Sequence, residues 1–337
     1  MEFIVLHGIT ALEAWDLGLG TNAQLVEHLD LAESATQPGD MRQFLDALSV
    51  LTRPLHILVG NARQRRHSRN WETHLIQRQL PQNSFFCIAP GIYIEAPYLC
   101  FAMLAGKLPF SHACWLGLEL CGRCSTLPYH ESARRIDPQK GYLERRPLTT
   151  VTLLERYSTA YGLGDKSMAR RACGIVQNNA RSPKECTLHL FSRFLPRLGG
   201  YGLRNYSLNE SVPLPPELAE LIGVEELEAD MLWRGLGPRK DRMLAVEYDG
   251  KDYHTDDRQR SYDNIRRTLL RNVGVEVITI DKWQLYDMAV LDGIMQIVSE
   301  AVGGPTVRQD TKARAARMAL RGELLAPGAN PYKLLIP

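Results

Sequence analysis

The sequence lacks any run of apolar residues that approaches the roughly 18 needed for a membrane-spanning helix. Its first stretch, MEFIVLHGITALEAW, lacks the basic segment and the cleavage site of a secretory signal peptide. Seven cysteines, an odd number spread widely along 337 residues, do not form the pattern of a disulfide framework. These absences exclude the membrane and secreted disulfide-rich classes, and we expect a protein of the reducing cytoplasm.

The chain also lacks a strong excess of charge, because its formal net charge is +2. Residues 181–300 contain 16 Lys and Arg against 20 Asp and Glu, whereas residues 301–337 contain 6 against 2. Attraction to a nucleic acid would therefore have to come from local patches and not from the overall field. The composition, 45% hydrophobic and 23% charged, is typical of a globular protein, and the length suits two modest domains of the α/β class.

The amino-terminal part, residues 1–150, is predicted to be an α+β domain. Short alternating apolar runs between turn residues predict strands at 56–59, 73–80, 84–88 and 91–97. Residues 98–122 predict two buried helices that are interrupted near Pro109. Apolar spacing of helical period over 151–180 predicts a helical bridge to the second domain.

Residues 181–302 predict an α-β-β-α-β order, with a closing helix over 284–302. Ser182 is a good helix cap, Pro183 suits the first helical position, and Glu185 follows the cap by three. LEADMLW (227–233) and RMLAVEYD (242–249) predict a hairpin, DRQRSYDNIRRTLLRNV (257–273) an amphipathic helix, and VEVITI (275–280) a buried strand. We expect a mixed sheet flanked by helices, followed by a basic tail over 303–337 with a helix at 311–325.

Acidic residues gather on the predicted hairpin. Glu247 and Asp249 lie two apart and so share one face of a strand, and the register of the hairpin could bring Asp230 beside them. Two carboxylates about 5 Å apart repel by roughly 3 kcal/mol at an effective dielectric near 20. A cation relieves that repulsion, and oxygen ligands favour Mg²⁺ or Mn²⁺, which can activate water for attack on a phosphate. The alternative is a solvent-facing strand edge with ordinary acids.

Four motifs occur in a fixed order: SPKE (182–185), AD (229–230), VEYDG followed by His254, and an Arg-rich helix before GVEVITI. Together they resemble the endonuclease-like domain of the PD-(D/E)XK superfamily, in the branch related to very-short-patch-repair endonucleases, over roughly residues 180–300. The resemblance implies a restriction-endonuclease-like core and metal-dependent phosphodiester cleavage, with Asp230 and Glu247 as metal ligands.

The resemblance also implies roles for the neighbouring residues. Asp249 stands where most of the superfamily has a lysine, so His254 would handle the proton and Lys251 would supply a positive charge. Glu185 would be a fourth acid near the metal, although a capping box explains the same residue. Arg266 and Arg267 would hold the scissile phosphate, or would lie on a solvated helix face.

Basic residues also gather in ARQRRHSRNW (62–71), where Arg63, Arg65, Arg66 and Arg69 precede a tryptophan. The pattern suits phosphate contacts from a loop, and the alternative is an exposed hairpin tip with solvated charges. Residues 50–125 loosely resemble AbiEi-type antitoxin-like proteins, which implies nucleic-acid binding or regulation. The pair Cys121 and Cys124 lacks a second pair for zinc, so we favour small core residues and a helix cap.

The sequence therefore predicts a cytoplasmic, Mg²⁺- or Mn²⁺-dependent DNA endonuclease or nickase, in a setting such as genome defence or repair. The alternative is a non-catalytic DNA-binding regulator, antitoxin-like, on a degenerate nuclease scaffold. RNA as the substrate and a homodimer both stay open, and no membrane partner is expected.

Overall fold

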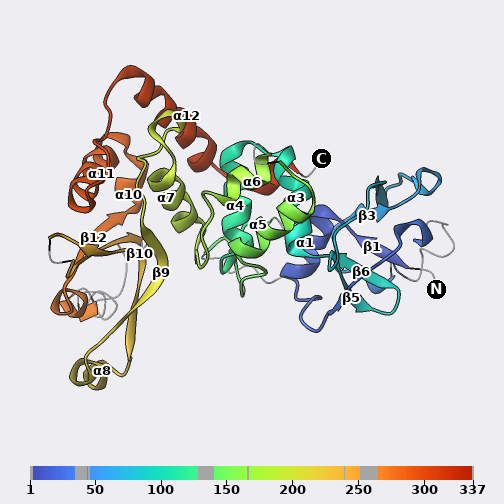
Figure 1. The fold of residues 1–337 in the computed structure, drawn as a ribbon, viewed down its shortest axis with the longest axis horizontal. Helices are drawn as coiled ribbons and strands as arrows, with labels where there is room; N and C mark the ends of the chain where they lie inside the picture. The colour runs from blue at the N-terminus through green and yellow to red at the C-terminus, as the bar shows by residue number, and fades with distance from the viewer. Residues whose placement is uncertain are drawn as a thin grey trace. The chain divides into compact units, whose positions relative to one another are not determined.

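The computed structural model describes residues 3–34, 44, 46–127, 140–164, 167–238, 240–250, 265–266 and 268–335. The chain forms two compact units, which Figure 1 shows in ribbon form: unit 1 is Met1–Val176 with Asn330–Pro337, and unit 2 is Gln177–Ala329. Both units combine helices with a mixed sheet, which confirms the predicted α/β class.

Unit 1 is built on a six-stranded mixed sheet of order β2-β5-β6-β1-β3-β4. Its strands are β1 (Ile4–Leu6), β2 (Gln24–Val26), β3 (Leu55–Val59), β4 (Trp71–Leu75), β5 (Phe85–Ala89) and β6 (Ile92–Glu95). The four predicted strands are therefore present. Strands β3 and β4 are parallel, so the Arg-rich segment between them is a crossover connection. The alternative of a hairpin tip holds only locally, where an antiparallel bridge between His67 and Glu72 closes a tight turn at the end of the segment.

The helices of unit 1 are α1 (Gly8–Asp16), α3 (Pro97–Leu104), α4 (Phe110–Leu120), α5 (Val151–Ala160) and α6 (Met168–Cys173). Short elements complete it: 3-10 turns η1 (Leu31–Glu33), η2 (Ala62–Gln64), η3 (Ala105–Lys107) and η5 (Pro331–Leu334), and strands β7 (Cys124–Ser125) and β8 (Leu143–Glu144). The predicted interruption near Pro109 is confirmed, because α4 begins just after it.

The segment 151–176 differs from the predicted bridge, because it is part of unit 1. Helix α5 packs on α3 and α6. Tyr157 and Tyr161 of this segment lie in the same buried cluster as Leu99. The apolar face that produced the helical period is thus covered by unit 1 itself, and the two units divide after Val176.

Unit 2 contains a four-stranded sheet of order β12-β11-β10-β9. Strands β9 (Tyr206–Pro213), β10 (Glu226–Leu236) and β11 (Arg242–Asp249) are antiparallel neighbours, and β12 (Val275–Asp281) is parallel to β11. The predicted hairpin and the last strand are confirmed. Strand β9 and the short helix α8 (Pro216–Ile222) that follows it were not predicted, so the order up to β12 is α-β-α-β-β-α-β, and the predicted α-β-β-α-β lacks one strand and one helix.

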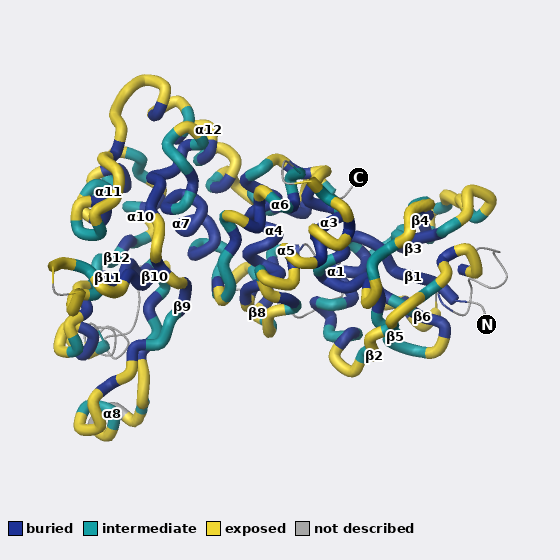
Figure 2. The backbone as a smooth tube through the Cα atoms, viewed as in Figure 1, coloured by how far each residue is buried: buried dark blue, intermediate teal, exposed yellow. Residues whose placement is uncertain are grey.

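Helices accompany this sheet: α7 (Pro183–Arg193), η4 (Pro196–Leu198), α8 (Pro216–Ile222), α10 (Lys282–Tyr286), α11 (Met288–Val302) and α12 (Thr311–Leu325). Residues 268–272 are helical between β11 and β12. Most of α7 is buried, as Figure 2 shows in dark blue. Leu269 and Leu270 pack with Ala245 in a second buried cluster, so helices support the strands that carry the acids.

The tail 303–337 does not behave as one basic segment, because residues 303–329 belong to unit 2 and 330–337 to unit 1. Helix α12 packs on α7 and η4. Arg317 of α12 is 2% exposed, and its Nε lies 3.0 Å from Asp292 Oδ1. The predicted helix at 311–325 is confirmed, but part of its basic character is used inside the fold.

None of the helices in the described part of the chain is long and apolar enough to cross a membrane.

Candidate active site

Glu185 lies in the first turn of α7, where the sequence predicted a capping box. The Ser182 side chain caps the helix by accepting from Glu185 N at 3.1 Å, and its hydroxyl donates to Glu185 Oε1 at 2.9 Å. Arg181 N donates to Glu185 Oε2 at 2.9 Å. The Ser182 cap is confirmed, whereas Glu185 accepts from the backbone N–H of Arg181 and not, as in a full capping box, from that of Ser182. These contacts hold the carboxylate in one orientation.

Asn209 of β9 connects Glu185 to the sheet. Its Nδ2 donates to Glu185 Oε2 at 2.6 Å and to Asn179 O at 2.9 Å. The residue is buried and has φ 46°, a left-handed conformation that asparagine tolerates better than most residues. Sequence reasoning missed Asn209, because only the register of an unpredicted strand places it beside Glu185.

Asp230 and Glu247 meet across the hairpin. Met231 pairs with Val246 in the antiparallel ladder, so the next pair sets Asp230 opposite Glu247. Directly opposed residues of an antiparallel pair share a face, where like charges are destabilising. Asp230 Oδ2 also accepts from Tyr248 N at 2.7 Å. The structure thus brings together the two carboxylates that the sequence assigned to a metal.

Two arginines accompany these acids. Arg266 Nη1 lies 2.9 Å from Glu247 Oε1, and its Nη2 donates to the backbone oxygen of Glu228 on β10. Arg181 forms an ion pair with the Glu228 side chain. Glu247 is 7% exposed, whereas Arg266 keeps 27% of its side chain exposed. Arg266 therefore neutralises a buried carboxylate and still reaches solvent.

The protonation of the acids follows from their burial. Burial and the nearby Asp230 carboxylate raise the pKa of Glu185 to about 7, although hydrogen bonds from Asn209, Arg181 and Ser182 lower it in part. Burial also raises the pKa of Asp230, although the Tyr248 N–H and the Arg266 guanidinium oppose that change. Two neighbouring carboxyl groups that resist full ionisation form an environment in which a bound cation would be stabilising.

Of the remaining predicted site residues on and after β11, Asp249 lies within the described part of the chain. Asp249 lies at the end of β11, half-buried, in register with Asp281 of β12. Asp281 is occupied as the N-cap of α10, where it accepts from Gln284 N. His254, Lys251 and Arg267 lie outside the described residues.

Among the described residues, the carboxylates of this site do not form a complete set of metal ligands. Within the described ranges, no three carboxylates of this site bring an oxygen each within 4.8 Å of one another. Mg²⁺ is usually held by one or two carboxylates and keeps several waters, so the pair Asp230 and Glu247 suffices for it. The donors present, oxygen atoms on opposed strands, fit a hard divalent cation better than zinc.

The Arg-rich segment of unit 1 is held in a defined shape. Asn61 caps η2 together with Gln64, whose Nε2 donates to the backbone oxygens of Ala32 and Ser34. Arg66 Nη1 donates to two carbonyl oxygens of its own loop. The predicted basic side chains, Arg63, Arg65, Arg66 and Arg69, are all exposed. The loop thus presents positive charge to solvent from an ordered backbone.

The CGRC cysteines are placed as core residues. Cys121 is the C-cap of α4, Cys124 begins β7, and both are buried. Burial raises the pKa of the Cys121 thiol far above its ordinary value. Neither cysteine is in a group of potential metal ligands among the described residues.

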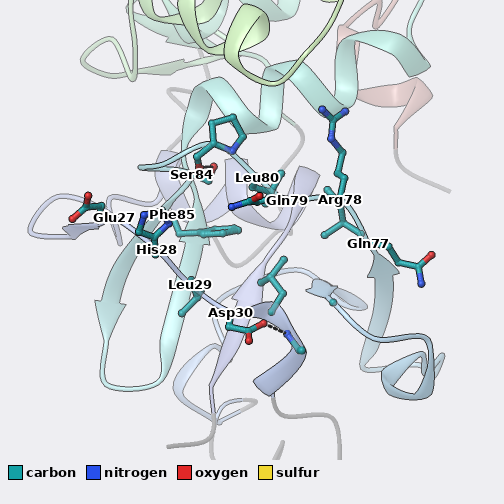
Figure 3. A pocket seen from close by; sticks show the side chains of 15 residues that line it. Glu27, His28, Leu29, Asp30, Gln77, Arg78, Gln79, Leu80, Ser84 and Phe85 are labelled. Atoms are coloured by element: carbon teal, nitrogen blue, oxygen red, sulfur yellow. Dashed lines mark hydrogen bonds between the residues drawn. The ribbon is translucent and has the colours of Figure 1, made fainter.

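A pocket of about 380 Å³ lies in unit 1 and contains none of the predicted site residues. Figure 3 shows Leu29, Phe85 and Leu80 on its wall together with polar groups at its rim. Two of these polar groups are already engaged, because Asp30 accepts from Ala32 N and Arg78 donates to the backbone oxygen of Tyr161. The pocket therefore offers space without a convergent set of reactive groups.

Comparison with protein-family models, curated proteins and solved structures finds no match to this chain.

Proposed function

We propose that unit 2 is a metal-dependent DNA endonuclease or nickase of the PD-(D/E)XK type. The observation that carries the proposal is the opposition of Asp230 and Glu247 across the hairpin, with Glu185 held beside them through Asn209. The position of Asp230 and Glu247 on β10 and β11, the two central strands of a mixed four-stranded sheet, supports the same proposal. An ordinary strand edge does not account for buried acids placed opposite one another.

Each residue of the proposed site would have its own role in the reaction. Asp230 and Glu247 would hold Mg²⁺ or Mn²⁺, which when bound supplies charge neutralisation at a phosphate and an activated water. Glu185 would orient that water from α7. Arg266, bound to Glu247 and partly exposed, would hold the scissile phosphate through its planar guanidinium. His254 would receive or return the proton, as the resemblance implies.

Unit 1 would bring the DNA to this chemistry. Four exposed arginines on the ordered connection after β3 suit contacts with phosphates, and such contacts are independent of sequence. None of the seven cysteines, which all lie in the described ranges, forms a disulfide, and this supports a reducing compartment such as the cytoplasm. Genome defence or repair is the setting that the resemblance suggests.

A DNA-binding regulator is the second candidate, and one observation favours it. The ion pair of Arg266 with Glu247 satisfies that acid without a metal, and Asp249 stands in the place of the usual lysine. In a regulator the acids would be a structural remnant, and metal binding would not depend on them.

Plasmid cleavage distinguishes these functions. Supercoiled plasmid would be incubated with Mg²⁺ or Mn²⁺ and the wild type, Asp230→Asn, Glu247→Gln or the control Glu226→Gln, an exposed acid of the same strand β10. We expect nicking by the wild type and the control, and a loss on the order of 100-fold in the other two, the scale seen when groups that position a metal are removed.

Three other outcomes are informative. Cleavage that survives both amide substitutions would show that the site lies elsewhere. Binding of duplex DNA by the wild type, without cleavage of duplex, single-stranded or mismatched DNA, would favour the regulator. Cleavage of RNA alone would keep the chemistry and change the substrate.

A further inference from the structure

A second group of metal-ligand side chains lies in unit 1, on the parallel strands β3 and β4. His56 of β3 is in register with Glu72 of β4, and His74 follows Glu72 by two residues, so it shares the same face. One ligand atom from each side chain lies within 4.8 Å of the other two, and all three residues are half-buried. This group contains none of the residues proposed for the nuclease.

The two imidazoles face each other through their nitrogens. His56 Nδ1 lies 2.8 Å from His74 Nε2, and the rings are stacked with centroids 5.0 Å apart. Burial, together with the charges of the neighbouring His7, His56, Lys107 and Arg65, lowers the pKa of His74 to about 3. Burial also lowers the pKa of His56, against the carboxylate of Glu72. Both rings are therefore neutral near pH 7, the form in which imidazole binds a metal.

Neighbouring groups hold this arrangement in place. His7 directly follows β1, and its backbone N–H donates a hydrogen bond to the backbone oxygen of His56 at 2.8 Å. The His7 ring packs against His74 with centroids 4.6 Å apart, and His7 Nδ1 lies 2.7 Å from Glu95 Oε1. Glu95 is fully buried and also accepts from Gly8 N at 2.9 Å. The ligands are thus supported by packed and hydrogen-bonded side chains, as metal ligands usually are.

We propose that His56, Glu72 and His74 bind a divalent transition metal ion of the zinc class, with water completing its coordination. Two imidazoles and one carboxylate form a donor set that zinc commonly accepts, whereas Mg²⁺ prefers oxygen donors alone. A tetrahedral ion about 2.05 Å from each nitrogen separates the two nitrogens by about 3.3 Å. The rings would therefore move apart by only about half an ångström.

The bound ion would stabilise the edge of the six-stranded sheet of unit 1, where β4 lies. Strand β4 is the last strand of the six-stranded sheet and pairs along its length with β3, and Glu72 also forms an isolated antiparallel bridge with His67. Coordination from both strands would tie β4 to β3 next to the connection that carries the exposed arginines. This role goes beyond the proposed nuclease activity and does not depend on it.

The test is a calorimetric titration with Zn²⁺ of the full-length chain, first freed of metal with a chelator. Excess Mg²⁺ is present throughout to occupy sites made of oxygen ligands. We expect one Zn²⁺ per chain in the wild type, and an affinity about 100-fold lower in His56→Ala and in His74→Ala. His28→Ala is the matched control, because His28 is an exposed histidine of the same unit and should leave the affinity unchanged.

Further variants distinguish loss of the proposed site from misfolding of the chain and from Zn²⁺ binding at another site. Glu72→Gln keeps the size of the side chain and should weaken Zn²⁺ binding, and circular dichroism would show that it folds. Asp230→Asn should bind Zn²⁺ like the wild type. Absence of a Zn²⁺ site in the wild type would leave only a hydrogen-bonded histidine pair and overturn the proposal. Binding that survives the His and Glu variants, or that is lost in Asp230→Asn, would overturn it as well.

Discussion

At the scale of single residues, Arg266 is relevant to both functions considered for unit 2, the nuclease and the DNA-binding regulator. It contacts the Glu247 carboxylate and the backbone of β10 at once, and 27% of its side chain remains exposed. A guanidinium cannot lose its proton near neutral pH, so it cannot act as a base and can only hold negative charge. In the proposed nuclease, Arg266 would therefore supply a positive charge in place of the superfamily's lysine, but not proton transfer, which the proposal assigns to His254.

Glu119 of α4 illustrates how burial alone controls protonation in this protein. It is fully buried and accepts hydrogen bonds from Trp115 Nε1 at 3.0 Å, Thr126 Oγ1 at 2.7 Å and Tyr332 OH at 2.8 Å. Burial nevertheless raises its pKa to about 7 from 4.5, because the hydrogen bonds and Arg145 compensate only in part. The folded state therefore binds this proton more tightly than the unfolded state.

A pH dependence of stability follows from that difference. Because the folded-state pKa is the higher one, the free energy of unfolding should fall as the pH rises from about 4.5 to about 7, by about 3 kcal/mol from this group. Urea unfolding at a series of pH values should show a shallower fall for Glu119→Gln. The exposed Glu144→Gln is the control and should follow the wild type. Equal slopes in all three proteins would contradict the prediction.

At the scale of elements, the cap of α7 stabilises the helix, and in the proposed nuclease it would also orient a residue of the site. Ser182 caps α7, and its hydroxyl donates a hydrogen bond to Glu185. Ser167 caps α6 in unit 1, and unit 1 contains none of the site residues Glu185, Asp230 and Glu247. Ser182→Ala and Ser167→Ala should each lower stability by about 1 kcal/mol, the usual cost of a lost cap. Only Ser182→Ala should also reduce plasmid nicking, because only that hydroxyl orients Glu185.

Thermal unfolding and the nicking assay, run on both variants, check this prediction. A similar loss of nicking in Ser167→Ala would mean that lower stability explains the effect. An unchanged activity in Ser182→Ala would mean that the orientation of Glu185 does not matter for the reaction.

The elements also show what the sequence could predict. Period-2 and helical patterns located β10, β11, β12, α7 and α12, since each has a continuous apolar face. Strand β9, YSLNESVP, was missed because polar residues dominate it and Asn209 interrupts the extended backbone. Glu247 was recognised from its spacing to Asp249, and Asp230 from the expected hairpin register and the family resemblance, but Asn209 and Arg181 join the site only through tertiary register. Glu72 and His74 carry the spacing of a shared strand face, yet His56 joins them only because β3 and β4 are parallel.

At the scale of the whole molecule, the chain leaves unit 1 after Val176 and returns to it at Asn330. Within unit 1, η5 packs against α4. Tyr332 is 1% exposed, and its hydroxyl donates to Glu119 Oε2. Unit 1 is therefore completed by residues that follow all of unit 2 in the sequence, and its stability should depend on them.

Removal of residues 330–337 should destabilise unit 1 and leave unit 2 unaffected. Loss of a buried aromatic side chain costs about 3–5 kcal/mol, and the Glu119 carboxylate also loses a donor. Hydrogen exchange followed by mass spectrometry should show faster exchange in α4, with protection of β10 and β11 unchanged, because exchange reports local stability along the chain. Nicking of plasmid should persist if the acids of unit 2 carry the chemistry.

Point variants separate the contributions of the segment. Tyr332→Phe keeps the ring and loses the hydrogen bond, so it should cost about 1–3 kcal/mol. Leu334→Ala is the control, because Leu334 is 56% exposed and its truncation should have little effect. If truncation left exchange in α4 unchanged, the segment would not stabilise unit 1. If it accelerated exchange in β10 as much as in α4, the two units would share one unfolding equilibrium, because separate cores are what allow one unit to open while the other stays folded.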